Sequence, residues 1–297
     1  MPVPRRSARR ALAITARAIS LGAISLGAIT LSGVTLGLGT SSSAQRPVLE
    51  LRGSMMGGNL IVGRTAPGSR VRVANADVRV SRRGVFLFAL APDQTGRVAV
   101  SVRTRDGDRE HRELEVSART YPTRRLDDVP EELVTPDGEL AAEERAFQAR
   151  FREAALHDGE DPHFEAGFTW PVQAAITSPF GAQRIMHGTR QRHVGVDLAV
   201  PVGHAVRAPG DGVVTLVATG PVFGHTLVID HGHGLTSALL HLSRAHVGLG
   251  DRVRRGDVVA SSGRSGRVSG PHLDVRTQLL GVPVDPASVI AGLPPRR

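Results

Sequence analysis

The residues of this 297-residue chain that are best suited to chemistry lie in three short stretches between His193 and Asp274. The first stretch is His-Val-Gly-Val-Asp at 193–197, the second is Leu-His-Leu-Ser around His241, and the third is Pro-His-Leu-Asp at 271–274. The first and third stretches contain two histidines and two carboxylates. These are the ligand types of a catalytic zinc site.

The even spacing of these polar residues predicts that short strands present them. Residues two apart on an extended strand point to the same face, so His193, Gly195 and Asp197 would share one face, with apolar residues behind them. His272 and Asp274 would share a face in the same way. A helix also brings residues four apart together, but a glycine and two valines within five positions disfavour it.

The bland alternative is a chance pattern, because nine of the chain's 12 histidines fall between His187 and His272. The motifs occur in this order within a matching Gly and Val framework, which makes a site the better interpretation. The other histidines of the region are expected to be solvated or structural: His187, His204, His225, His231, His233 and His246. Among them, His231 is a candidate for lining a groove and His225 for a substitute ligand.

Residues from about Phe168 to Asp285 resemble the lysostaphin-type (LytM-type) zinc metallopeptidases, which cleave peptide bonds in bacterial cell walls. The resemblance covers somewhat under half of the chain. The matching sequences are Ser-Pro-Phe-Gly (178–181), His-Val-Gly-Val-Asp-Leu-Ala (193–199), Pro-Val-Gly-His-Ala-Val-Arg-Ala-Pro-Gly-Asp-Gly-Val-Val (201–214), Val-Ile-Asp-His-Gly (228–232), Leu-His-Leu-Ser (240–243), Gly-Asp-Arg-Val-Arg-Arg-Gly-Asp (250–257) and Ser-Gly-Pro-His-Leu-Asp (269–274).

The resemblance implies that His193 and Asp197 are metal ligands and that His241 and His272 are catalytic histidines. The third ligand of the family is the second histidine of a His-x-His sequence, and Asp274 holds that position here. The sequence also departs from the family at two further positions. Leu239 stands where an aromatic residue is usual, and His225 stands where asparagine is usual.

These roles imply a hydrolytic zinc with three protein ligands and one open position. One of His241 and His272 would take a proton from the attacking water, and the other would stabilise the oxyanion. With two Asp ligands the formal charge of the zinc cluster is zero, which predicts a more alkaline optimum than one Asp gives. Carboxylates also suit Mn²⁺. The alternative, in which Asp274 binds no metal, remains open.

The first 44 residues are interpreted as a signal peptide. A basic start is followed by an apolar run and then by Ser42-Ser43-Ala44, small residues suited to cleavage. A retained membrane anchor is the alternative, because the apolar run approaches the roughly 20 residues that span a bilayer. The expected location is therefore the periplasm or the exterior, reached by the general secretory route rather than twin-arginine export.

Composition limits the function classes further. The chain has no Cys, which excludes disulfides and thiolate metal sites. Its formal net charge of +9 falls to +4 once the five Arg of the predicted signal peptide are removed, and this modestly basic balance suits anionic wall polymers. Nucleic-acid binding is a poor interpretation, because the Arg residues are scattered and there is one Trp and one Tyr.

The predicted fold is mostly β. Alternating short strands separated by turn residues predict an immunoglobulin-like β-sandwich over 45–120. Apolar residues between Leu140 and Leu156 predict one amphipathic helix in a linker over 121–165. Residues 166–297 predict an antiparallel β domain, with a loop at 261–270 bordering the site. That loop lacks the Lys of a phosphate-binding loop.

Three functions follow from these observations. The favoured one is an exported zinc endopeptidase that cuts cross-bridges or stem peptides of peptidoglycan. The second is an inactive domain of the same fold that binds the wall or activates a cell-wall amidase, with a division protein as a further candidate partner. The third is a purely structural envelope protein.

Overall fold

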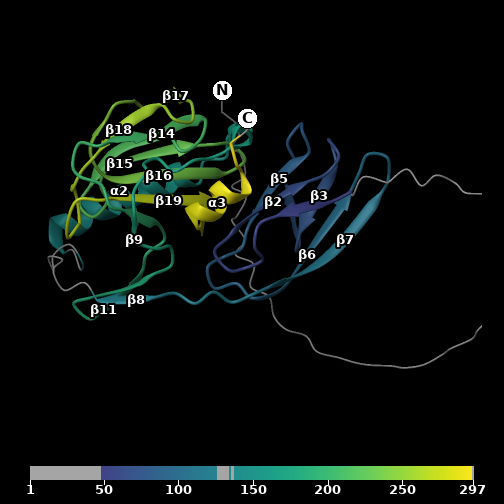
Figure 1. Ribbon diagram of the computed structural model, residues 1–297, viewed down its shortest axis with the longest axis horizontal. Coiled ribbons are helices and arrows are strands. Elements are labelled where there is room, and N and C mark those ends of the chain that lie inside the picture. The colour runs from purple at the N-terminus through teal and green to yellow at the C-terminus, as the bar shows by residue number, and fades with distance from the viewer. Residues whose placement is uncertain (1–47, 126–133, 135–136, 296–297) are drawn as a thin grey trace, which may run out of the picture.

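The computed structural model describes residues 48–125, 134 and 137–295. The predicted signal peptide, 1–44, lies outside these residues. No helix within the described part of the chain has the length and apolar character needed to cross a membrane. Most of the described elements are strands, as the sequence predicts (Figure 1).

Two small sheets form the N-terminal part. The first has the order β1-β2-β5 and the second the order β4-β3-β6-β7. The strands are β1 (Glu50–Arg52), β2 (Leu60–Arg64), β3 (Arg70–Val73), β4 (Ala76–Val78), β5 (Val85–Ala89), β6 (Gly96–Arg103) and β7 (Arg109–Val116). Both sheets contribute to one apolar core, in which Ile61 and Phe86 of the first meet Val71 and Val100 of the second.

Strands β2 and β5 of the first sheet are buried on both faces. Alternate side chains of a strand point to opposite faces, so Ile61 enters the core between the two small sheets, while Leu60 and Val62 enter a second core. The second core contains Phe164 and Val289 from the C-terminal part of the chain. The N-terminal sheets are therefore packed against the C-terminal part.

The linker contains the predicted helix, α2 (Gly138–Ala155), and a short 3-10 helix, η1 (His163–Ala166). Phe147 and Phe151 of α2 are buried against Phe223. The linker also contains a strand that the sequence analysis missed, β8 (Thr123–Arg125). This strand pairs in parallel with β10 (Gln183–Met186) of the C-terminal part.

A ten-stranded sheet dominates the C-terminal part, with the central order β17-β14-β15-β16-β19-β12-β9, and its pairings are antiparallel. Its strands are β9 (Ile176–Ser178), β12 (Val196–Leu198), β13 (Ala205–Arg207), β14 (Gly212–Gly220), β15 (Gly224–Asp230), β16 (Leu235–Ala245), β17 (Arg252–Val253), β18 (Val258–Ser262), β19 (Leu273–Leu279) and β20 (Val282–Val284). The hairpin of β10 (Gln183–Met186) and β11 (Thr189–Arg192) lies beside it, and α3 (Pro286–Gly292) follows it.

The register of three adjacent strands brings the site residues together. Asp197 of β12 pairs directly with Asp274 of β19, and Asp274 pairs on its other side with Leu240 of β16, next to His241. One expectation was wrong in detail. His193 lies in the connection between β11 and β12 rather than on a strand, so its proximity to Asp197 depends on how that connection folds.

Candidate metal centre and catalytic groove

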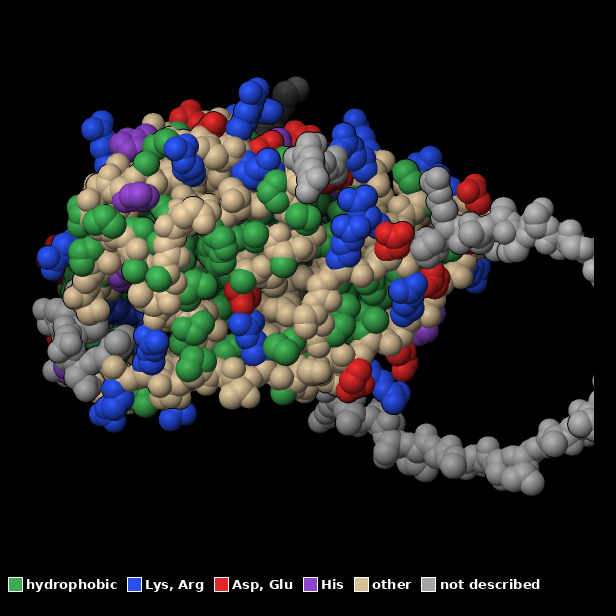
Figure 2. Space-filling view, in the orientation of Figure 1, with side chains coloured by type: hydrophobic (Ala, Val, Ile, Leu, Met, Phe, Trp, Pro, Cys, Tyr) green, Lys and Arg blue, Asp and Glu red, His purple; other side chains and the backbone are tan. Residues whose placement is uncertain are grey.

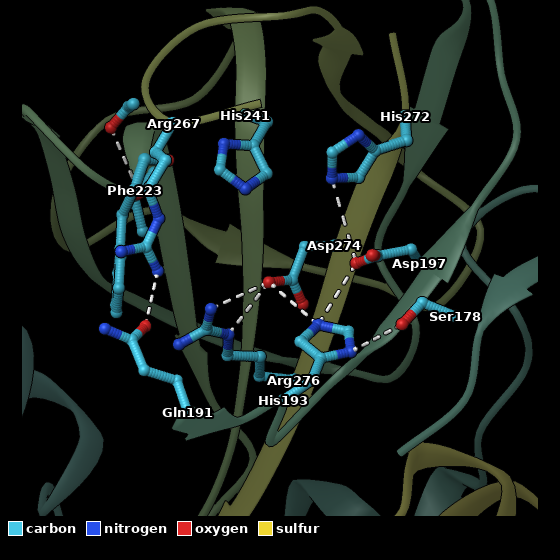
Figure 3. Close-up of polar contacts among 12 residues, drawn as sticks. Ser178, Gln191, His193, Asp197, Phe223, His241, Arg267, His272, Asp274 and Arg276 are labelled. Atoms are coloured by element: carbon cyan, nitrogen blue, oxygen red, sulfur yellow. Dashed lines mark hydrogen bonds and ion pairs between the residues drawn. The ribbon is translucent and has the colours of Figure 1, made fainter. Parts of the chain in front are cut away.

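His193, Asp197 and Asp274 are brought together by the fold, and each offers one ligand atom within 4.8 Å of the others (Figure 3). Nε2 of His193 lies 3.1 Å from Oδ1 of Asp197 and 3.4 Å from Oδ2 of Asp274. Ligand atoms about 2.0–2.2 Å from a tetrahedral zinc stand roughly 3.3–3.5 Å apart. The spacing of these three side chains therefore fits a zinc ion.

Burial without hydrogen bonding gives a second test of fit. Among the described residues, Nε2 of His193, Oδ1 of Asp197 and Oδ1 of Asp274 are buried polar atoms with no hydrogen-bond partner. Such atoms cost free energy unless something satisfies them. Each of the three predicted ligands has one such atom, which suits a bound cation.

Two arginines hold the other oxygen of each carboxylate. Nη2 of Arg184 donates to Oδ2 of Asp197, and Nε and Nη2 of Arg276 donate to Oδ2 of Asp274 over 3.0 and 2.8 Å. Neither arginine was predicted from the sequence. Asp274 and Arg276 are two positions apart on one strand, so this pairing could have been inferred from the sequence. Arg184 lies on a separate hairpin, so its pairing with Asp197 had no such signal.

The charges shift the pKa values of all three candidate ligands. Burial opposes ionisation of Asp274, but Arg276 and His193 outweigh it and hold the Asp274 pKa well below its usual range. Burial likewise acts against the charged form of Asp197, and its contact with His193 outweighs this and lowers the pKa. Burial alone would lower the pKa of His193, but the two carboxylates raise it.

His241 and His272 face each other across the site, with ring centroids 4.9 Å apart. Nδ1–H of His241 donates to the carbonyl of Ser265 over 2.8 Å, and Nδ1–H of His272 donates to the carbonyl of Gly270 over 2.9 Å. These bonds select the tautomer with an unprotonated Nε2. Both rings therefore present a proton acceptor to the site.

His241 has unusual backbone geometry for a strand residue. Its φ is +61°, in the left-handed region, and the pairing of β16 with β18 is irregular just after it. Left-handed backbone is rare for residues other than glycine and is often found at functional sites. Burial lowers the pKa of His241 to about 4, so the ring is neutral at physiological pH.

A cavity of about 220 Å³ opens beside these residues, lined by Asp197 and His272. Arg124 of the linker strand β8 lines it too, and its Nη1 donates to the carbonyl of Thr177 over 2.6 Å. Residues 267–271 form another wall, so the loop at 261–270 borders the groove as the sequence predicts.

The remaining histidines of the region lie outside the group of candidate ligands. His225 is exposed and bonds to Thr219, so the structure gives no support for it as a substitute ligand. His231 is fully buried between the carbonyl of Asp211 and the hydroxyl of Ser237 and is structural rather than groove-lining. His246 bonds to Ser261 at the surface.

Known proteins resemble mainly the C-terminal part of the chain. Residues 191–286 match the profile of "Peptidase family M23". The DD-carboxypeptidase/endopeptidase Mpg of Neisseria meningitidis is 38% identical over 125 residues, which are 41% of this chain and 29% of that protein. The peptidoglycan DD-endopeptidase ShyA of Vibrio cholerae is 39% identical over 120 residues, which are 39% of this chain and 28% of that protein.

A crystal structure of a putative peptidase M23 from Pseudomonas aeruginosa is similar over more of the chain. It has a TM-score of 0.62 and 26% sequence identity, and the similarity covers 81% of this chain and 96% of that one. The two curated relatives are matched over less than a third of their own length. With the site geometry, these matches show that residues 191–286 of this chain belong to Peptidase family M23.

Proposed function

We propose that this protein is a zinc metalloendopeptidase that hydrolyses peptide bonds in peptidoglycan. The observation that carries the proposal is the convergence of three buried candidate ligands beside two histidines whose Nδ1–H groups are held by backbone carbonyls. Two similar proteins bear names that describe peptidoglycan or DD-endopeptidase activity. The substrate class is inferred from those names and the chemistry from the geometry.

In this proposal His193, Asp197 and Asp274 hold the metal. A bound zinc supplies a Lewis acid for the scissile carbonyl and lowers the pKa of a water molecule. Mn²⁺ is an alternative ion, because two of the three ligands are carboxylates. The fixed carboxylates of Asp197 and Asp274 need no rearrangement to receive the ion, since Arg184 and Arg276 already hold them.

His241 and His272 carry out the proton transfers. Each Nδ1–H is held by a backbone carbonyl, which fixes the ring and leaves Nε2 directed toward the site. One ring accepts the proton of the attacking water, and the other, once protonated, donates a hydrogen bond to the oxyanion. The cavity lined by Asp197 and His272 is the proposed place for the peptide segment that is cut.

We also propose the division of the chain into a signal peptide (1–44), a β-sandwich of immunoglobulin-like type (45–120), a linker (121–165) and the peptidase domain (166–297). Arginine side chains are dispersed among acidic ones on the face shown in Figure 2, rather than gathered in one basic patch. This dispersal suits broad attraction to an anionic polymer. The proposed substrate supports a periplasmic or secreted location.

The first test incubates residues 45–297 with peptidoglycan sacculi and zinc and measures new amino groups and altered muropeptides. A His241→Ala variant is the control. Release that the variant lacks would establish a peptidase. No release from folded protein with Zn²⁺ or Mn²⁺ at any pH would refute the proposal and favour the amidase-activating alternative.

A further inference from the structure

We propose that Arg276 is a positioning residue that makes the Asp274 carboxylate a one-oxygen metal ligand, and that Phe223 and helix α2 hold Arg276 in place. The inference deepens the proposed function and rests on its metal site. It concerns how this chain accommodates an aspartate as its third ligand.

The two carboxylate oxygens of Asp274 make different contacts. Oδ2 accepts from both Nε and Nη2 of Arg276 and also lies 3.4 Å from Nε2 of His193, whereas Oδ1 is buried and makes no hydrogen bond. The Asp274 side chain is 1% exposed and that of Arg276 is 13% exposed, so water scarcely competes with this pair. Because the two donors fix the orientation of the carboxylate, Oδ1 is the atom available to an ion.

The pair also resolves a charge problem. Asp274 adds a second negative charge to a buried site that already contains the Asp197 carboxylate, 3.1 Å from His193. Arg276 cancels that charge, so Asp274 and Arg276 together are formally neutral, as an imidazole ligand is. Asp197 has a similar arrangement, with Oδ2 held by Arg184 and Oδ1 lying 3.1 Å from Nε2 of His193. Each carboxylate ligand is therefore paired with its own guanidinium.

Arg276 is held in turn by an aromatic cluster. Its guanidinium carbon lies 4.3 Å from the ring centroid of Phe223, within the range of a cation–π contact. The Phe223 ring meets Phe147 and Phe151 of α2 at centroid distances of 5.5 and 5.1 Å. Helix α2 precedes the family-matching segment, so the linker supports the metal site through Phe223 and Arg276.

The absence of a side chain at Gly195 leaves space for the Asp274–Arg276 pair. A Cβ at that position would lie 2.2 Å from Oδ1 of Asp274 and 2.8 Å from Cγ of Arg276. The missing side chain therefore lets the pair lie against the connection between β11 and β12.

The test measures the zinc dissociation constant of the metal-free full chain by competition with a chromophoric chelator. Loss of a group that orients a metal ligand typically weakens affinity by about 10–100-fold, which is the expectation for Arg276→Gln. Arg276→Lys keeps the positive charge but loses the pair of donors that holds one carboxylate oxygen. The zinc affinity of this variant should therefore fall between those of the wild type and Arg276→Gln. Phe223→Leu should weaken binding by roughly 3–10-fold.

Arg119→Gln is the matched control. Arg119 also pairs with a buried carboxylate, Asp285 at 2.7 Å, and lies over two aromatic rings, but its hydrogen bonds go to Asn59 and Asp285 and not to a metal ligand. Its loss should affect thermal stability and leave zinc affinity within about 2-fold. Thermal melts of each variant establish that it is folded.

A double-mutant cycle separates positioning from general structural support. In an Asp274→His background the imidazole has no need of Arg276, so adding Arg276→Gln should change zinc affinity by less than about 3-fold. Equal effects of Arg276→Gln in both backgrounds, or none in the wild type, would overturn the inference while leaving the peptidase proposal intact. A wild-type chain that binds no zinc would overturn both.

Discussion

The rings of His241 and His272 lie 4.9 Å apart and are oriented by the same device, a backbone carbonyl that accepts from Nδ1–H. The two residues are 31 positions apart in the sequence, in β16 and just before β19, which are neighbouring strands of the large sheet. In the neutral rings this relationship leaves both Nε2 atoms as proton acceptors.

His241→Gln and His272→Gln should each lower kcat on peptidoglycan by about 10²–10⁴-fold, the usual contribution of a positioned acid or base. Zinc affinity should stay within a few-fold of wild type, because neither residue belongs to the group of candidate ligands. Muropeptide release and chelator competition measure the two quantities. The exposed His246 provides a His→Gln control; a comparable loss of kcat there would contradict the assignment.

Arg276→Gln should move the acid limb of the kcat/KM profile to higher pH. The variant loses the positive charge that offsets Asp274, so a water near the two carboxylates becomes harder to ionise. The shift is expected to be roughly 1–2 pH units. The wild type should correspondingly have a less alkaline optimum than two aspartates alone would give. Superimposable profiles for wild type and variant, recorded at saturating zinc, would count against this account.

Acid should destabilise the fold through His231. Full burial lowers its pKa from 6.5 to about 4, so the unfolded state takes up a proton before the folded state does. The resulting stability is fully present above pH 6.5 and is lost as the pH falls from 6.5 toward 4, by roughly 3 kcal/mol at most.

His231→Gln tests this dependence. The variant should be less stable at pH 7, because the bonds to Asp211 and Ser237 are altered. Its free energy of unfolding should nevertheless fall less steeply between pH 6.5 and 4. Urea titrations of metal-free protein at several pH values measure the slopes. Parallel slopes for the two proteins would show that His231 does not titrate as described.

Gly195→Ala should weaken zinc binding by at least about 10-fold with the fold retained. The new Cβ would approach Oδ1 of Asp274 to 2.2 Å and the backbone oxygen of Val275 to 2.9 Å, so the carboxylate must move. Gly248→Ala is the control, because its Cβ would meet one atom at 3.7 Å. Chelator competition and circular dichroism provide the measurements, and unchanged zinc affinity in Gly195→Ala would refute the steric argument.

The sequence alone predicted most of the strands, the linker helix and the family of the C-terminal segment. Strand alternation and helical periodicity are local patterns. The burial of residues such as Leu60 and Phe147 could therefore be predicted from the apolar residues near them in the sequence. The identity of the five site residues could also be read, because the family motifs are short and contiguous. Their roles as ligands and catalytic groups remain predictions for experiment.

Only the tertiary structure revealed what supports those residues. Arg184 of the β10-β11 hairpin donates a hydrogen bond to Asp197 on β12. The ring of Phe223 contacts the guanidinium of Arg276 from across the sheet. The β8 strand joins β10 across roughly 60 residues of chain, and the β2-β5 face packs on Phe164. Such contacts depend on how distant segments fold together in space. Their free energy comes from desolvated charges and buried rings, neither of which leaves a periodic signal in the sequence.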